Sequence, residues 1–349
     1  MSDHKKFDVV IGNPPYQEEA QGASTRAEPI YPLFMDAAYE VADLAVLVTP
    51  ARFLSNSGQT KSAWNRKMLA DPHLKVADYV PDSSELFPGT DIKGGIVVTY
   101  RDATAVIGPI GTFLGAMAKS MSGILTKVES TNRESLSTLV SSRALYRFSD
   151  LAADDHVEIR RSLGSGSGNQ ITPPSLGVLS NVVFFDDEPA DEHEYIRLIG
   201  VIKGARERRW IRRDYVNKTA SLDRWKVVIA QANNSGAFGE TLSSPLVAEP
   251  GLGHTDTFLS VGSFDTAAEA EACLQYLKTK FARALLSVLK TTQHNPKGKW
   301  KHVPLQDFTT GSDIDWTKTV IEIDRQLYAK YGLDVDEIAF IEGKVKPMV

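Results

Sequence analysis

The stretch FDVVIGNPPY, at residues 7–16, decides how the first part of the chain folds. Phe7 to Ile11 form an apolar, β-branched run, which is typical of a buried strand. The run ends at Gly12. The two prolines after Asn13 block both a helix and further strand pairing, because proline has no backbone N–H. We therefore expect a strand that stops abruptly and presents Asn13 and Tyr16 in a rigid turn at its carboxyl end.

The residues that follow this turn predict a βαβ unit. Apolar residues recur at helical spacing from Ile30 to Val41, and Leu44 to Val48 have the pattern of a second buried strand. Strands joined through a helix of this length pair in parallel, with a right-handed crossover. We therefore expect a parallel sheet.

Further elements extend the same pattern. The sequence predicts a helix at about residues 61–69 and strands at residues 74–80 and 96–100. Residues 1–102 are thus expected to form part of an open α/β sheet. In such sheets ligands bind beyond the carboxyl ends of the strands, which is where Asn13 lies.

The sequence from Asn13 to Tyr16 offers a specific set of groups to an amine attached to an aromatic ring. An asparagine oxygen and the carbonyl of the next residue can accept the two amine hydrogens, and the prolines hold that carbonyl rigidly. Such acceptors favour the amine as it becomes tetrahedral during attack, so they stabilise the transition state. Tyr16 supplies a flat wall, and stacking contributes about 1–3 kcal/mol per base. The alternative interpretation is a simple turn after a strand.

Four blocks of sequence carry a resemblance to a known family. Residues 7–17 resemble the catalytic motif of amino-methyltransferases that use S-adenosylmethionine. The block LFPGTDIKGG at residues 86–95 resembles a later motif of their adenine-specific branch, the restriction–modification methylases of the Eco57I type. The segment VTPARFL at residues 48–54 matches that family's strand-end segment, and residues 321–333 resemble its C-terminus. The resemblance implies methyl transfer to an adenine flipped out of the DNA duplex.

The resemblance also implies roles for individual residues. Asn13, Pro14, Pro15 and Tyr16 would form the catalytic pocket. In that family an aromatic residue just before a proline in the later motif packs on the flipped base. Phe87 is therefore the candidate for a second wall beside Tyr16, with a core phenylalanine as the alternative.

The family implies an α/β fold in three parts. Residues 1–102 would be the catalytic half of the methyltransferase domain, which is the C-terminal half of a partial Rossmann-like sheet. Residues 103–310 would be a mixed α+β target-recognition domain that binds DNA, and residues 311–349 a C-terminal helical tail. Within the middle region the sequence predicts the strands Val178–Phe185, Trp225–Ala230 and Thr257–Val261. It also predicts a long helix from a capping box at Thr266 to about Leu289.

Methyl transfer implies S-adenosylmethionine as the donor, but the glycine-rich cofactor loop of the family is absent from this sequence, so the cofactor-binding residues are unknown. In the family that loop precedes the catalytic motif, whereas here only six residues precede Phe7. The sheet would then expose an apolar edge and face. The chain would be one half of a split enzyme, a fragment, or the product of a decayed gene or misassigned start. We expect weak or no S-adenosylmethionine binding by the chain alone, which micromolar binding in isothermal titration would contradict.

Two basic stretches indicate double-stranded DNA as a partner. Forked guanidinium groups suit phosphates or guanine edges. The candidates in the first stretch are Arg206, Arg208, Arg209, Arg212 and Arg213, and those in the second are Lys297, Lys299 and Lys301, beside Trp300. The candidates for reading adenine edges are Gln231, Asn233 and Asn234. The alternative is that both stretches are solvated loops, because charge runs usually only solvate.

The composition narrows the classes of protein that remain. The 349 residues carry a net charge of −5, and the sequence has neither an apolar run of membrane-spanning length nor a signal peptide. The single cysteine, Cys273, cannot form an internal disulfide or by itself supply a cysteine-type zinc site, so we expect no metal and a cytoplasmic location.

Three functions remain open from the sequence. The first is an adenine-specific DNA methyltransferase of a restriction–modification system, with or without a paired restriction endonuclease. The second is a non-catalytic DNA-specificity module. The third is protein glutamine methylation, which uses the same motif on an amide nitrogen. The long region after the motif argues against this third function.

Overall fold

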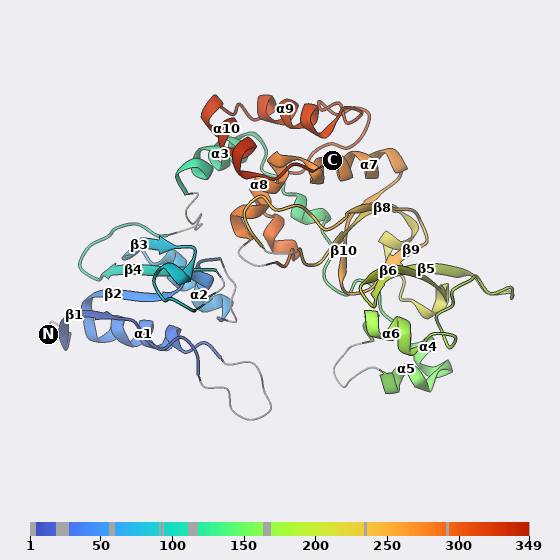
Figure 1. Ribbon diagram of the computed structural model, residues 1–349, viewed down its shortest axis with the longest axis horizontal. Helices are drawn as coiled ribbons and strands as arrows, with labels where there is room; N and C mark the ends of the chain where they lie inside the picture. The colour runs from blue at the N-terminus through green and yellow to red at the C-terminus, as the bar shows by residue number, and fades with distance from the viewer. Residues whose placement is uncertain are drawn as a thin grey trace. The chain divides into compact units, whose positions relative to one another are not determined.

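The computed structural model describes residues 5–18, 28–55, 60–90, 92, 94–110, 118–162, 169–233, 236–290 and 293–348. The chain divides into two compact units, Met1–Gly123 and Ile124–Val349, each of which is described by itself (Figure 1). In the part of the chain that the structure describes, no helix is long and apolar enough to cross a membrane.

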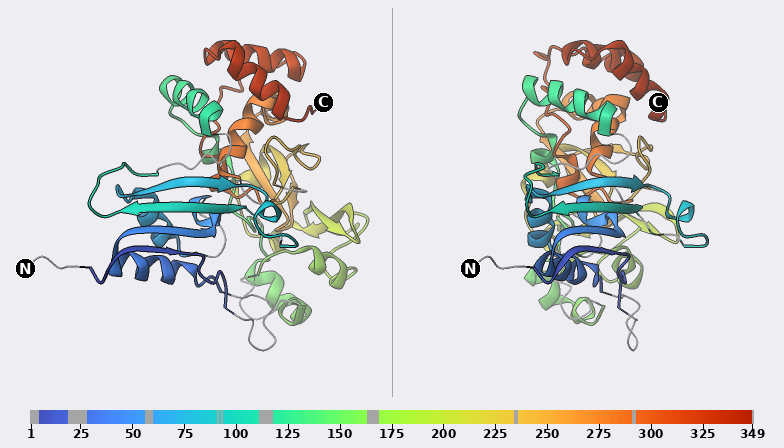
Figure 2. Two further views of the ribbon diagram at one scale, coloured as in Figure 1. Left: turned by 60° about the vertical axis from the view of Figure 1, so that its left-hand side comes forward. Right: turned by 90° about the vertical axis from the view of Figure 1, so that its left-hand side faces the viewer.

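The first unit is built on a four-stranded sheet with the order β1-β2-β4-β3 (Figure 2). Its elements are β1 (Phe7–Gly12), α1 (Tyr31–Val41), β2 (Ala42–Pro50), α2 (Ser62–Ala70), β3 (Leu74–Val80) and β4 (Ile96–Asp102). β1 and β2 pair in parallel, with Val9 beside Leu44, and α1 joins them. The predicted βαβ unit is therefore confirmed.

The direction of β4 differs from the prediction of a parallel sheet. β4 pairs antiparallel with both β2 and β3, so the prediction was wrong and the sheet is mixed. A parallel neighbour needs a crossover, whereas residues 81–95 turn back at the edge where β3 ends. Gly95 makes this return possible: its φ is +78°, and a Cβ there would lie 2.5 Å from the Val80 carbonyl oxygen.

The two helices of this unit pack on the sheet and form its core. Met35 of α1 and Met68 of α2 are buried against Leu47 of β2 and Val97 of β4. At the margin of the sheet β1 is an edge strand. Three of its apolar side chains remain exposed to 50%, 43% and 77%, namely those of Phe7, Val9 and Ile11.

The second unit contains two three-stranded sheets, with the orders β6-β5-β9 and β10-β7-β8. Their strands are β5 (Tyr195–Ile202), β6 (Ala205–Arg212), β7 (Trp225–Ala230), β8 (Leu246–Ala248), β9 (Leu252–His254) and β10 (Phe258–Phe264). β7 and β10 confirm the strands predicted near residues 225–230 and 257–261. β5 and β6 form a hairpin that was not predicted, and its turn consists of Lys203 and Gly204, both with positive φ.

The strand predicted at Val178–Phe185 is wrong. The helix α6 (Pro173–Val178) ends there, and turns follow it. Two prolines at its start and a capping box at Thr172 favour the helix locally.

The helices of the second unit are α4 (Asp150–Asp155), α5 (Val157–Ser162), α6, α7 (Ala267–Lys278), α8 (Lys280–Leu289), α9 (Val320–Lys330) and α10 (Val335–Lys344), while α3 (Ala118–Thr131) spans the boundary between the units. The capping box at Thr266 is confirmed. The predicted long helix is wrong, because Thr279 is extended and separates α7 from α8.

Candidate active site and DNA-contact residues

The candidate catalytic motif, Asn13 to Tyr16, follows the last residue of β1 directly. Asn13 is exposed, whereas Tyr16 is half-buried and packs against the core of the first unit. The carbonyl oxygen of Tyr16 accepts a hydrogen bond of 3.1 Å from the N–H of Ile30, just before α1. The far end of the motif is thus anchored, and Asn13 is open to an incoming group.

The Tyr16 hydroxyl is buried and has no hydrogen-bond partner among the described residues. Burial raises the pKa of this hydroxyl, and the polar side chain of Asn13 partly offsets the rise. Tyr16 therefore remains neutral at pH 7.

The carboxyl end of β2 and the start of β4 lie at the same end of the sheet as the carboxyl end of β1. The N–H of Ala51, directly after β2, donates to the carbonyl oxygen of Gly95, directly before β4, at 3.0 Å. A Cβ on Gly94 would lie 3.1 Å from the Cγ of Arg52, so this backbone passes close to the Arg52 side chain. Since β1 and β2 are parallel and β4 is antiparallel, Asn13 lies at this edge as well. The structure thus brings three separate blocks of sequence to one edge.

Phe87 lies in the loop between β3 and β4. Its side chain is half-buried, and the core cluster among the described residues of this unit does not include it. A cavity of about 620 Å³ is lined by residues of the same loop, among them Ser84, Gly89 and Thr90. Phe87 therefore lies in the loop at the same end of the sheet as Asn13, outside the core cluster of this unit.

Four of the five candidate arginines near β6 are held by protein groups. Arg206 donates to the carbonyl oxygens of Ser243 and Ser244, and its guanidinium group lies 5.2 Å from the centre of the Phe258 ring. Arg209 forms ion pairs with Asp186, at 3.0 Å, and with Glu207. These contacts shape the hairpin and compete with any contact to DNA.

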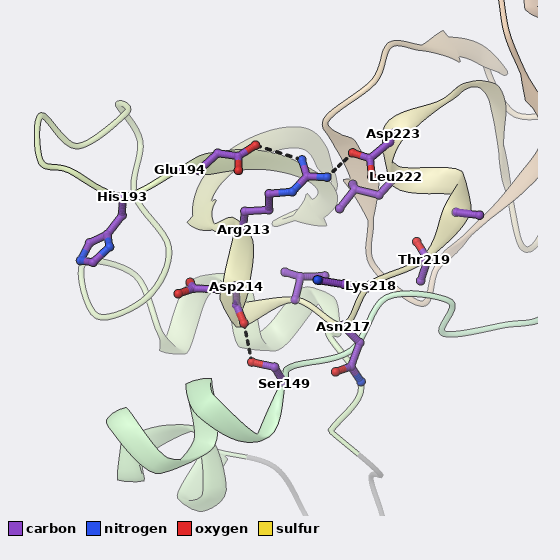
Figure 3. A pocket seen from close by; sticks show the side chains of 12 residues that line it. Ser149, His193, Glu194, Arg213, Asp214, Asn217, Lys218, Thr219, Leu222 and Asp223 are labelled. Carbon is purple, nitrogen blue, oxygen red and sulfur yellow. Dashed lines mark hydrogen bonds and ion pairs between the residues drawn. The ribbon is translucent and has the colours of Figure 1, made fainter.

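Arg212 and Arg213 are held in the same way. Arg212 pairs with Asp214 at 2.6 Å and stacks 4.3 Å from the centre of the Tyr215 ring. Arg213 pairs with Asp223 and Glu194 at the side of a cavity of about 820 Å³ (Figure 3). The neighbouring acids raise the pKa of Arg213, so both arginines stay charged and paired.

Arg208 differs from the other four arginines. It lies on β6 opposite Ile199, and its side chain is exposed. Among the described residues, no hydrogen bond, ion pair or ring contact holds its guanidinium group. Arg208 is therefore the arginine of this group that is most available to a phosphate or a base edge.

Several cations between residues 278 and 290, before the three candidate lysines, are used inside the fold. Lys280 pairs with Glu342 at 2.5 Å, Lys290 forms a buried ion pair with Glu240, and the buried Arg283 donates to the carbonyl oxygen of Lys346 at 2.6 Å. These cations are not available to hold DNA.

The three lysines predicted to contact DNA lie in or beside η7 (Lys297–Trp300). Lys297 and Lys301 are exposed, whereas Lys299 is half-buried and burial lowers its pKa to about 8. Trp300 is fully buried and donates from its Nε1 to the carbonyl oxygen of Asn295, so it is a core residue. The aromatic predicted to act together with these lysines therefore cannot contact DNA in this structure.

Two of the regions predicted to contact DNA are paired through their backbones. Asn233 donates to the carbonyl oxygen of Gln293 at 2.7 Å, and Asn295 donates to that of Gln231 at 2.8 Å. The Asn233 side chain is buried and accepts a hydrogen bond from the Ser243 N–H, so it supports this loop rather than facing outward. Asn234 lies outside the described residues.

Comparison with known proteins identifies relatives of the catalytic segment. Residues 1–87 match the family model described as Eco57I restriction-modification methylase. A protein of Mycoplasma pneumoniae (strain ATCC 29342 / M129 / Subtype 1) described as an uncharacterized adenine-specific methylase is 30% identical over 95 residues. The matched region is 26% of this chain and 22% of that protein, so the chain spans about a fifth of the length of this relative. The resemblance recognised in the sequence is thus confirmed for the segment that carries the catalytic motif.

Two solved structures are also similar to the chain. The Type IIL restriction-modification enzyme MmeI, determined in complex with DNA, has a TM-score of 0.44 at 8% identity, over 97% of this chain and 56% of that one. The type IIG restriction endonuclease BpuSI has a TM-score of 0.36 at 12% identity, over 97% of this chain and 53% of that one. The chain thus spans little more than half the length of either.

Proposed function

We propose that this chain carries the catalytic pocket and the target-recognition region of an adenine-specific DNA methyltransferase of a restriction–modification system. The observation that carries the proposal is an exposed Asn13 in the sequence Asn-Pro-Pro-Tyr at the carboxyl end of β1, within the segment that matches methylases. The proposed substrate is an adenine flipped out of double-stranded DNA. The division into a catalytic region at residues 1–102, a recognition region at 103–310 and a tail at 311–349 remains part of this proposal.

The groups of the motif account for the chemistry on the side of the base. The Asn13 side-chain oxygen and the Pro14 carbonyl accept the two hydrogens of the exocyclic amine, and Pro15 has no N–H to compete. Tyr16 and Phe87 pack on the two faces of the base in place of its lost neighbours. The amine nitrogen then attacks in line, and the chain's contribution is to position and polarise it.

S-adenosylmethionine supplies the methyl group in this proposal. Among the described residues no strand is followed by a glycine-rich loop that would hold this donor, so none of them is assigned to it. β1 is an edge strand with exposed apolar residues, and such an edge accepts a further strand. We propose that another polypeptide segment, in the same or a second chain, packs there and brings the donor to Asn13.

The variant Asn13→Ala tests the catalytic proposal. Wild-type protein is expressed in a bacterial host without adenine methylation, alone or with the products of the neighbouring reading frames, and N6-methyladenine in the host DNA is mapped by sequencing. Asn13→Ala should lower methylation by about 100-fold or more, because it removes an acceptor that acts in the transition state. DNA binding should change by less than about twofold. Glu18→Gln, at an exposed position just after residues 7–17, is the matched control.

Two outcomes would contradict the proposal. Equal methylation by wild type and Asn13→Ala would show that the motif is not the catalytic pocket. DNA binding without methylation by the wild-type protein under every condition would favour a non-catalytic DNA-specificity module.

A further inference from the structure

The loop between β3 and β4 is closed by the hydroxyl of one buried serine. Ser83 is 3% exposed, and its Oγ donates to the carbonyl oxygen of Thr90 at 2.7 Å and accepts from the N–H of Ile92 at 2.8 Å. The carbonyl oxygen of Ser83 accepts a hydrogen bond from the N–H of Phe87, also at 2.8 Å. Ser83 thus joins the start of the loop to its middle and to its end.

Apolar packing contributes little to the order of this loop. Leu86 is 45% exposed, and Pro88, Gly89 and Thr90 are exposed as well. Gly89 turns the chain with a φ of +81°, and no atom lies within 4 Å of the position its Cβ would take. The buried Ser83 hydroxyl therefore restrains this loop through two backbone partners, beside the hydrogen bond of 3.0 Å from the Thr90 N–H to the Phe87 carbonyl oxygen, and its removal leaves both of its partners unsatisfied.

We infer that Ser83 is a positioning residue for Phe87. This inference rests on the proposed function, in which Phe87 packs on the flipped adenine. The hydroxyl ties Ser83 to Thr90 and Ile92, on the far side of Phe87 in the loop, and so fixes the position and orientation of the Phe87 ring. An aromatic wall is effective only when its plane matches that of the base. Sequence reasoning missed Ser83, because two adjacent serines after Asp82 look like an ordinary turn.

Amide hydrogen exchange on the DNA-free full chain tests the structural half of the inference. Ser83→Ala should speed exchange at the Phe87 and Ile92 amides by about tenfold or more, because both amides depend on the closed loop. Ser84→Ala is the matched control: Ser84 is the next residue, is exposed, and donates only to the Asp82 carboxylate, at 2.6 Å. Equal exchange in Ser83→Ala and wild type would overturn the inference.

Base packing is then measured with 2-aminopurine at the target position, once sequencing has identified that position. Ser83→Ala should lower kcat/KM for DNA about tenfold and change the fluorescence of the bound 2-aminopurine, whereas Ser83→Thr, which keeps the hydroxyl, should restore both. In a Phe87→Ala background Ser83→Ala should cause no further loss, because Ser83 acts through the ring. An additive loss would show a merely structural role and would overturn the inference.

The two proposals fail in different ways. If wild-type protein, even with the products of the neighbouring reading frames, neither methylates DNA nor changes the 2-aminopurine signal, the proposed function is contradicted and the role of Ser83 in base packing falls with it. A normal wild-type signal that Ser83→Ala leaves unchanged contradicts the Ser83 inference alone.

Discussion

Lys226 is a buried lysine in the centre of a sheet, and few neighbouring groups stabilise its positive charge. It lies on β7, the middle strand of its sheet, and is fully buried. Its Nζ donates to the carbonyl oxygen of Arg224 at 3.1 Å, and burial lowers its pKa from 10.5 to about 8, against a smaller opposing effect of Asp223. The folded protein therefore holds this ammonium group at a cost in stability.

Lys226→Met should raise the free energy of unfolding at pH 7, by at most about 3 kcal/mol, because it removes the buried charge. The cost is complete below pH 8. It declines as the pH rises from 8 to 10.5 and disappears above 10.5, where the amine becomes neutral in the unfolded state as well as in the folded state. Urea unfolding from pH 7 to pH 10 should therefore show the difference between variant and wild type shrinking towards zero. A variant less stable than wild type at pH 7 would contradict this account.

At the level of single residues, the sequence reveals some parts of the candidate site and not others. Asn13 to Tyr16 are contiguous, and their chemistry is limited to a few uses, so the sequence alone singles them out. Arg208 and Arg213 are indistinguishable in the sequence. Ion pairs with Asp223 and Glu194 hold Arg213, whereas Arg208 is exposed and without such a contact. That difference depends on residues distant along the chain, which no local pattern encodes.

At the scale of elements, the side chain of Asp324 on α9 caps the start of α8 and so separates α8 from α7. Asp324 is buried and accepts hydrogen bonds from the N–H groups of Lys280, at 3.0 Å, and Phe281, at 2.9 Å. These are the first two residues of α8, whose N–H groups have no partner within the helix. Burial raises the pKa of Asp324 to about 6, and these two hydrogen bonds oppose that rise, so the carboxylate is ionised at pH 7.

Asp324→Ala should lower the free energy of unfolding by about 2–4 kcal/mol, because it leaves two buried N–H groups without an acceptor. Asp324→Asn, which keeps one acceptor oxygen, should fall between the variant and wild type. Arg325→Ala, at an exposed position on the same helix, is the control and should change the free energy by less than about 0.5 kcal/mol. If Asp324→Ala unfolded at the same urea concentration as Arg325→Ala, the cap would contribute nothing.

These elements also show where sequence-based prediction of the fold succeeds and fails. The βαβ unit was predicted because its periodicity, its turn and its pairing are all local. The direction of β4 was not, because it depends on whether residues 81–95 cross the sheet or turn back. The break at Thr279 was missed since the apolar spacing continues through it, and its cap comes from Asp324, in another helix. The β5–β6 hairpin was missed because its dense charge obscured the alternation of the strands.

At the scale of the whole molecule, the net charge of −5 and the internal pairing of four of the five candidate arginines restrict how DNA can be held. Arg206, Arg209, Arg212 and Arg213 all have protein partners. Binding through phosphates then depends on the few cations that remain exposed, among them Arg208. We therefore expect a modest dependence of DNA affinity on salt, with each exposed cation contributing a measurable share.

Arg208→Ala should raise the dissociation constant for duplex DNA about five- to tenfold at low salt. The slope of log affinity against log salt should become shallower by about one, because one phosphate contact is lost. Fluorescence anisotropy over a series of salt concentrations measures both quantities. Arg325→Ala removes an equal charge from an exposed position on α9 and should leave the slope unchanged, which separates a local contact from a change in net charge.

If Arg208→Ala lowered affinity for one DNA sequence only and left the slope unchanged, Arg208 would contact a base edge rather than a phosphate. If both variants behaved like wild type, the β5–β6 hairpin would not be part of the DNA-binding surface.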